Sequence, residues 1–222
     1  MSIENKACLL IKRQRGVRKT RLSELTSTEI LDSGTGFFVT DRSIITAQHV
    51  LGDDMVDPTF VVIEDVLCPI TIEKQSAGYE DNDYLDYALI SSARTSMDNF
   101  GVTFREPTER EKLLCFGFSR NFKGKAISSC SFSDGEFYLN EITGSCFQNP
   151  ALVTKYGKNF NNGFIMFYDE PITKFPYGMS GGPIVNENLE LRGLLSLGWG
   201  NEPNVTGCQG LYLYKPLLWL KE

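Results

Sequence analysis

The sequence predicts an all-β protein built as a sandwich or a pair of barrels, and three observations support this fold class. Short runs rich in β-branched and aromatic residues recur along the 222 residues, separated by Gly, Asp, Asn and Pro. Few segments show the 3.6-residue periodicity of an amphipathic helix. The polar stretch 92–112 has the least periodicity and divides the strand-like runs into two groups. Many short strands in two groups are typical of a sandwich or barrel pair.

The strands are expected in chain order as two groups. The first group comprises 7–12, 36–40, 43–46, 59–64, 68–73 and 87–91, and the second comprises 113–118, 125–132, 136–141, 163–168, 182–185, 191–197 and 210–214. Asn186-Glu187-Asn188 predicts a hairpin turn between two strands of the second group. Short helices are expected over 46–51 and over 216–220, with Pro216 at the first position of the latter. We therefore divide the chain at 1–100 and 101–222.

Composition excludes several classes of function. With 41% apolar and 23% charged residues, the chain can bury a core and is not a disordered protein. The net charge of −6 argues against nucleic acid as the main partner, and we interpret the basic cluster 12–21 as a solvated loop or strand flank. No apolar run approaches the length of a membrane span, and the N-terminus lacks a secretory signal pattern. No membrane partner is expected.

Six cysteines are present, but they show no framework spacing and no Cys-x-x-Cys pair. Most of them lie within apolar runs, which is typical of reduced thiols in a protein core. This favours a reducing, cytoplasmic location. With a single histidine in the chain, a zinc site is improbable, and we expect no metal and no cofactor.

His49 is the only histidine, and it follows the apolar pair Ile44-Ile45 at the end of a predicted strand. Its side chain is the one whose ordinary pKa suits a general base near pH 7. Far downstream, Ser180 is flanked by Gly178 on one side and Gly181-Gly182 on the other. A serine hydroxyl becomes a nucleophile when a base lies within hydrogen-bond reach and a third group orients that base. His49 and Ser180 are therefore candidates for base and nucleophile.

Asp86 is the preferred orienting carboxylate, because it stands where an apolar strand begins and its burial needs a partner. Asp81 and Asp83 are nearby alternatives in a polar loop. The glycines around Ser180 allow a tight turn, which can aim the N–H groups of Gly178 and Ser180 at one point as an oxyanion hole.

Four segments, 34–39, 44–50, 86–90 and 178–183, resemble the chymotrypsin/trypsin-like serine peptidase family, and its bacterial and stress-protease branch more than its secreted animal branch. The resemblance implies two six-stranded antiparallel barrels with the active site in the cleft between them. It implies a serine endopeptidase in which His49 is general base and acid, Asp86 its orienting partner and Ser180 the nucleophile that forms an acyl-enzyme. The amides of Gly178 and Ser180 become the oxyanion hole.

Departures from the family pattern carry information. Secreted members have cysteines where this chain has Val50 and Pro176 or its neighbours, which indicates a disulfide-free, intracellular form. Met179 stands where zymogen-activated members have an aspartate that pairs with a newly cut N-terminus. Methionine cannot form that ion pair, so we expect packing or a partner to order the loop before Ser180.

Substrate binding is also implied by the resemblance. Ser196, Leu197 and Gly198 form the edge strand that pairs with the substrate backbone, and Gly198 and Gly210 line an open pocket for the side chain before the cut. Lys174 points inward and favours an acidic side chain, or it points outward and leaves an apolar pocket with Phe175 or Tyr177 as a wall. The outward alternative is favoured because lysines are mostly exposed.

Two other functions stay open at this point. The chain can be a catalytically silent module that binds extended peptides, although an intact triad argues against this. It can also be a trigger-activated effector domain of a larger protein, which would need an activating partner. In each case the expected ligand is a protein or peptide.

Overall fold

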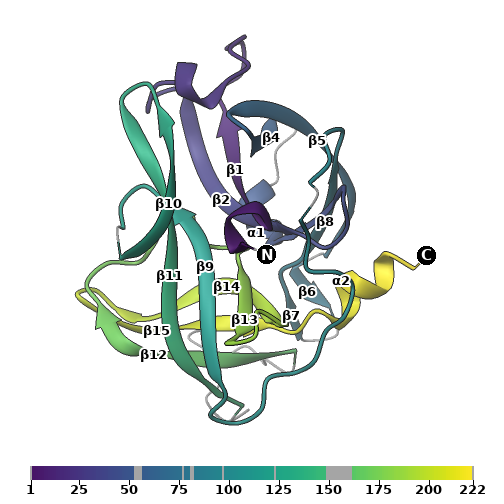
Figure 1. The fold of residues 1–222 in the computed structure, drawn as a ribbon, viewed down its shortest axis with the longest axis vertical. Helices are drawn as coiled ribbons and strands as arrows, with labels where there is room; N and C mark the ends of the chain where they lie inside the picture. The colour runs from purple at the N-terminus through teal and green to yellow at the C-terminus, as the bar shows by residue number, and fades with distance from the viewer. Residues whose placement is uncertain are drawn as a thin grey trace.

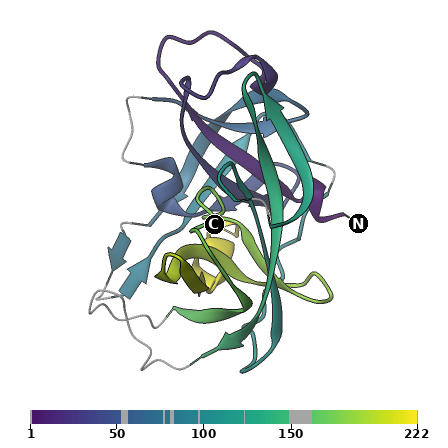
Figure 2. The same ribbon diagram turned by 90° about the vertical axis from the view of Figure 1, so that its left-hand side faces the viewer.

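The computed structural model describes residues 2–52, 57–76, 78–80, 83–96, 98–122, 124–148 and 162–221. Its strands form two antiparallel barrels, one above the other in Figures 1 and 2. The first barrel is closed, with the strand order β1 (Ala7–Arg13), β2 (Ile30–Phe38), β3 (Ser43–Thr46), β8 (Ala88–Ser92), β5 (Val66–Gln75) and β4 (Thr59–Ile63). The predicted all-β fold with two six-stranded barrels is confirmed.

The second barrel closes because β9 pairs with the strands at both ends of the ring. Its order is β9 (Lys112–Ser119), β11 (Gly135–Phe147), β12 (Gly163–Ile172), β15 (Asn204–Leu211), β14 (Leu191–Asn201) and β13 (Pro183–Asn186). A further strand, β10 (Lys125–Phe132), pairs with β11 alone. The β10–β11 hairpin extends from the second barrel alongside the first (Figure 2), where Ser133 N donates to Leu25 O at 2.8 Å.

Strand β1 shows how the two barrels share a core. Residues 7–11 are all buried, without the alternation of a strand that has one solvated face. One face of β1 lines the interior of the first barrel, and β1 also contacts β9 of the second barrel. A single hydrophobic cluster therefore includes Leu9 and Phe37 of the first barrel together with Phe116 and Leu194 of the second.

Short helical segments connect or cap the barrels. They are η1 (Ile3–Asn5), η2 (Leu22–Glu24), α1 (Gln48–Leu51) and α2 (Tyr214–Trp219). Figure 1 shows α2 returning from the second barrel to lie beside the first, where it contacts β8. Its Leu217 belongs to the shared hydrophobic cluster. Within the described residues, none of the helices has the length and apolar character needed to cross a membrane.

Several element predictions need correction. The last strand was expected over 210–214, but β15 spans Asn204–Leu211. Helix α2 begins at Tyr214, so Pro216 is its third residue and not its first. The two-stranded sheet of β6 (Gly78–Glu80) and β7 (Asp83–Leu85) was not predicted. The described part of 93–111 contains no strand, as expected for a crossing between two halves. The exact division at residue 100 stays a prediction.

All six cysteines are free thiols, as the sequence predicts. Five of them are buried: Cys8, Cys68, Cys115, Cys146 and Cys208. Burial raises the pKa of the Cys146 thiol to about 12, so this group is a neutral core residue and not a reactive thiolate.

Candidate active site

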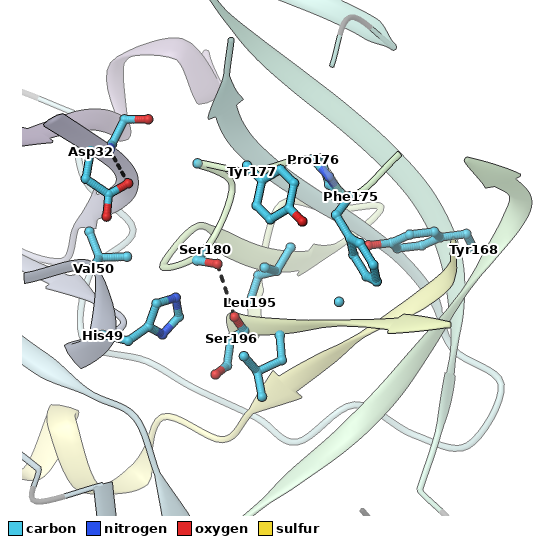
Figure 3. A pocket seen from close by; sticks show the side chains of 14 residues that line it. Asp32, His49, Val50, Tyr168, Phe175, Pro176, Tyr177, Ser180, Leu195 and Ser196 are labelled. Atoms are coloured by element: carbon cyan, nitrogen blue, oxygen red, sulfur yellow. Dashed lines mark hydrogen bonds between the residues drawn. The ribbon is translucent and has the colours of Figure 1, made fainter. Parts of the chain in front are cut away.

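A cleft of about 330 Å³ lies between the two barrels (Figure 3). The first barrel and its helix α1 contribute Asp32, Ser33, His49 and Val50, and the second barrel contributes Tyr168, Phe175, Pro176, Tyr177, Gly178, Ser180, Leu195, Ser196, Leu197 and Gly198. The predicted base His49 and the predicted nucleophile Ser180 therefore line the same cleft from opposite barrels.

His49 is positioned by the one-turn helix α1, which begins two residues after β3 ends. The helix packs closely on β2, because a Cβ built on Gly34 would overlap the side chain of Val50. Glycine at position 34 thus allows α1 to approach the strand. The His49 side chain keeps 40% of its surface exposed, so substrate can reach the imidazole.

Asp86 lies directly behind the imidazole and is 1% exposed. Strands β3 and β8 pair with Thr46 opposite Ala88, and this register brings the residue before β8 next to the residues after β3. Asp86 Oδ1 accepts a hydrogen bond from His49 N at 2.9 Å, and Oδ2 lies 2.7 Å from His49 Nδ1. The carboxylate therefore fixes the histidine at two points.

The alternative carboxylates do not displace this assignment. Asp81 lies outside the described residues, and Asp83 lies in β7. Asp86 also has a third hydrogen bond, which comes from the second barrel, since Ser196 Oγ donates to its Oδ2 at 2.5 Å. Ser196 is predicted as part of the substrate-binding edge, and its side chain also supports the buried carboxylate.

The electrostatics of the pair suit a base held by an ionised partner. Burial lowers the pKa of His49, but the hydrogen bond to Asp86 and the charges of Asp86 and Asp32 raise it more, so the pKa lies above its ordinary value. Burial raises the pKa of Asp86, but the hydrogen bonds and charge of His49 and the Ser196 hydroxyl lower it more, so the pKa lies below its ordinary value. At neutral pH Asp86 is ionised and accepts the Nδ1 proton, which leaves Nε2 as the basic nitrogen.

Ser180 sits in a tight turn whose shape depends on glycine. Gly178 and Gly181 have φ values of +96° and +84°, a region that favours glycine, and a Cβ on Gly181 would overlap Thr35 O. Gly181 N donates to Leu195 O at 2.7 Å and ties the turn to β14. Among the described residues, no group accepts a hydrogen bond from the amides of Gly178 or Ser180. Two neighbouring donors are thus available for an oxyanion.

Thr35 supports this turn from the other barrel, and sequence reasoning did not single it out. Its N–H donates to Ser180 O at 2.9 Å, and its Oγ1 donates to Gly178 O at 2.8 Å. The same Oγ1 accepts from Phe118 N at 2.8 Å, and the residue is fully buried. The available signal was a polar residue between two glycines, directly before the apolar run Phe37-Phe38-Val39.

Met179 is fully buried in the hydrophobic cluster of the second barrel. A Cβ on Gly117 of β9 would lie 2.7 Å from Met179 Cα, so the turn is packed directly on the barrel wall. Apolar packing therefore holds the loop before Ser180, which is one of the two alternatives left open by the sequence.

The Ser180 hydroxyl does not bond to the imidazole in this structure. Its Oγ donates to Ser196 O at 3.1 Å, the contact drawn as a dashed line in Figure 3, and no hydrogen bond joins it to His49. The base and the nucleophile face the same space without being in contact through a hydrogen bond.

The predicted substrate residues divide into two groups. Ser196, Leu197 and Gly198 line the cleft, while Lys174 and Gly210 do not. Lys174 is exposed, so the outward alternative holds, with Phe175 and Tyr177 as one wall of the cleft.

The two glycines do not leave open space. A Cβ on Gly198 would overlap the ring of Phe175, and one on Gly210 would overlap the ring of Phe164. Each glycine therefore makes room for a phenylalanine of the same chain and not for a substrate. No cluster of His, Cys, Asp and Glu that could hold a metal ion occurs among the described residues.

This fold and site define a class of protein: two six-stranded antiparallel barrels with a cleft between them are the architecture of the chymotrypsin-like proteases. The model of the trypsin-like peptidase domain matches residues 34–194, which is more than half of the chain. The chain therefore belongs to the trypsin-like peptidase family.

Solved structures with this fold include bacterial proteases and a kallikrein. The active form of the Rv3671c protease from M. tuberculosis has a TM-score of 0.63 at 13% identity, covering 98% of this chain and 80% of that one. Kallikrein-related peptidase 10 has a TM-score of 0.62 at 17% identity, with 96% and 93% covered. The MamO protease domain from Magnetospirillum magneticum has a TM-score of 0.59 at 15% identity, with 96% of both chains covered. At these identities the likeness shows the fold alone. No curated protein sequence matches this chain.

Proposed function

We propose that this protein is a serine endopeptidase that hydrolyses peptide bonds through an acyl-enzyme on Ser180. One observation carries the proposal: the buried Asp86 carboxylate holds His49 through two hydrogen bonds, in the cleft that Ser180 also lines. An oriented base beside a serine in a tight glycine turn is the arrangement that nucleophilic catalysis by a hydroxyl requires.

The reaction begins when the Ser180 hydroxyl rotates from Ser196 O toward His49 Nε2. As Oγ attacks the scissile carbonyl carbon, Nε2 takes its proton, and the carbonyl oxygen becomes an oxyanion that the amides of Gly178 and Ser180 bind. His49 then gives the proton to the leaving amine, and the acyl-enzyme forms. Water, activated by the same imidazole, releases the acid and restores Ser180. Loss of one oxyanion donor in such a site typically reduces kcat by about 10²–10³.

The substrate backbone is expected along β14. This strand pairs with β13 only as far as Leu194, whereas its pairing with β15 continues to Asn201. One edge of 196–198 therefore faces the cleft and can accept an extended peptide as an added strand. The ligand in this proposal is a protein or peptide, and the mechanism uses no cofactor.

A silent peptide-binding module is the second candidate. It is favoured by the hydroxyl of Ser180, which donates to a backbone carbonyl and not to the base. In that case the same strand edge would bind peptides without cleaving them.

Location and regulation are parts of the proposal. Six free cysteines support a reducing, cytoplasmic location. The buried Met179 supports a loop that is ordered without a new N-terminus. Activation by a partner, or within a larger protein, is an additional proposal for a protease that would otherwise act freely among cellular proteins.

Hydrolysis of a peptide library by wild-type protein, Ser180→Ala and His49→Ala tests the proposal. We expect cleavage by the wild type and a loss of at least 10³-fold in each variant, with unchanged far-UV circular dichroism. Peptide binding without cleavage by the wild type would favour the silent module, and full activity of either variant would rule out the assignment.

A further inference from the structure

One end of the cleft is filled by a side chain of the protein itself. Phe175 and Tyr168 lie at the end away from His49 (Figure 3). The Phe175 ring packs against the backbone of β14, because a Cβ on Gly198 would overlap its Cδ1 and Cε1 atoms. The ring thus covers the face of β14 at Gly198, beside the strand edge assigned to the substrate backbone under the proposed function.

The main chain on both sides of this ring is anchored. Phe175 N donates to Glu202 Oε1 at 2.8 Å, and Phe175 O accepts from Asn121 Nδ2 at 3.1 Å. The next residue, Pro176, is buried. The backbone position of Phe175 is therefore fixed, and the ring could leave the cleft only by a rotamer change that breaks its contact with Gly198.

The position of the reacting carbonyl defines what this ring excludes. In a bound peptide, the carbonyl oxygen at the cut meets the amides of Gly178 and Ser180, and the backbone follows 196–198. The side chain of the residue before the cut then points into the space between that edge and the wall formed by 175–177. The Phe175 ring occupies this space. We propose that Phe175 is a specificity-determining residue that fills the subsite, so that the protein cleaves after Gly, Ala or Ser; this inference rests on the function proposed above.

Charge at this end of the cleft supports a small, uncharged residue. Two ionisable residues that line the cleft, Asp32 and His49, lie near the end opposite to Phe175 (Figure 3). Burial raises the pKa of the Tyr168 phenol well above its ordinary value, so it stays neutral, and Lys174 is exposed outside the lining. A basic or acidic side chain here would lose water without meeting an oppositely charged group among the described residues that line this end of the cleft. A large apolar one would overlap the ring.

Peptides that differ only in the residue before the cut test this inference. With Ala, Phe, Lys and Glu at that position, we expect kcat/KM of the wild type to be at least tenfold higher for Ala than for the other three. Phe175→Ala should raise kcat/KM for the Phe peptide at least tenfold, because one buried hydrocarbon group can change discrimination by about 10- to 200-fold. Phe175→Leu keeps the subsite largely filled and should retain the preference for Ala. Lys174→Ala, at the neighbouring exposed residue, should leave all ratios unchanged.

Labelling of Ser180 by a fluorophosphonate, measured in parallel, separates this inference from the proposed function. A wild type that labels but cleaves after Phe, Lys or Glu as well as after Ala would overturn the subsite assignment alone. The same holds if a folded Phe175→Ala variant keeps the wild-type ratios. If Phe175→Ala does not fold, the wild-type preference and Phe175→Leu still decide the matter. A wild type that neither labels nor cleaves would remove both proposals.

Discussion

At the scale of single residues, the His49–Asp86 pair predicts how the activity depends on pH. The hydrogen bond and charges that raise the pKa of His49 outweigh its burial, so a higher pH is needed to leave the base neutral than for an isolated histidine. The base works only when Nε2 is unprotonated. Activity should therefore fall as the pH decreases through a value above 6.5, the ordinary pKa of histidine.

Nuclear magnetic resonance can measure this pKa directly, because His49 is the only histidine in the chain. We expect the titration midpoint of its ring protons to agree with the midpoint of kcat/KM and to lie above 6.5. Asp86→Asn removes the charge that raises the pKa while burial still lowers it, so the midpoint should decrease and kcat should fall by about 10⁴. An unchanged midpoint in Asp86→Asn would show that this carboxylate does not act on the imidazole.

Thr35 provides a second residue-scale prediction. Thr35→Val keeps the shape of the side chain but leaves Gly178 O and Phe118 N without their partner. Each unsatisfied buried group costs about 1–3 kcal/mol of stability. Because the proposed mechanism uses the Gly178 amide as an oxyanion donor, kcat should decrease more than KM changes.

Thr46→Val is the matched control for Thr35→Val. It also removes a fully buried hydroxyl, whose hydrogen bond goes to Thr35 O at 2.7 Å and not to the turn that carries Ser180. Chemical denaturation and steady-state kinetics on both variants check the comparison. Equal losses of kcat in the two variants would mean that Thr35 acts on stability only.

At the scale of elements, the sequence could predict most of the runs that form strands, but not the β6–β7 hairpin, nor where all of the strands end. The start of β2 was missed because 31–34 alternates apolar, charged and small residues without a clear pattern. The strand β15 was shifted because Gly207 looks like a turn residue, although Gly210 was placed at the start of the expected strand. In the structure they sit within the strand, where Met166 O and the Phe164 ring approach too closely for a Cβ. Such approaches come from distant parts of the chain.

The candidate site divides in the same way. The placement of His49 beside Asp86, and of His49 and Ser180 in one cleft, was predictable because each residue carries its signal in its own neighbours: the end of an apolar strand, the start of another, and a glycine turn. The filled subsite was not, because the space beside Gly198 is taken by Phe175, which lies in another segment. Thr35 likewise depends on contacts between the barrels.

The packing of α1 on β2 gives a prediction about an element. Gly34→Ala introduces a methyl group that overlaps Val50, so α1 must move away from the strand and carry His49 with it. Overpacking of this kind costs about 1–3 kcal/mol, and a displaced base should lower kcat by roughly 10- to 100-fold. The double variant Gly34→Ala, Val50→Ala restores the space and should recover part of both losses. Steady-state kinetics and thermal unfolding measure this recovery. If the double variant recovers neither loss, the position of α1 does not control activity.

At the scale of the whole molecule, the two barrels share one hydrophobic cluster and are joined by buried polar contacts. Tyr87 OH donates to Tyr212 O at 2.5 Å, and Asp86 is joined to Ser196 across the cleft. The catalytic proposal depends on this contact between the barrels, because the base and the nucleophile come from different barrels.

We therefore expect the protein to unfold in one transition. Calorimetry should give equal calorimetric and van't Hoff enthalpies, with a value of about 150 kcal/mol near 60 °C for a chain of this length. The mixed cluster of Leu9, Phe37, Phe116 and Leu194 would be disrupted if either barrel unfolded alone. Two separate transitions would show that the barrels are independent domains and that the shared core contributes little.

Fluorophosphonate labelling tests most directly whether His49, Asp86 and Ser180 act as one unit. Mass spectrometry of the digested protein gives the site and the rate of labelling. We predict a single adduct on Ser180 in the wild type, no adduct in Ser180→Ala, and labelling at least 10³-fold slower in His49→Ala. An adduct on another residue, or a His49→Ala variant that labels at the wild-type rate, would contradict the account.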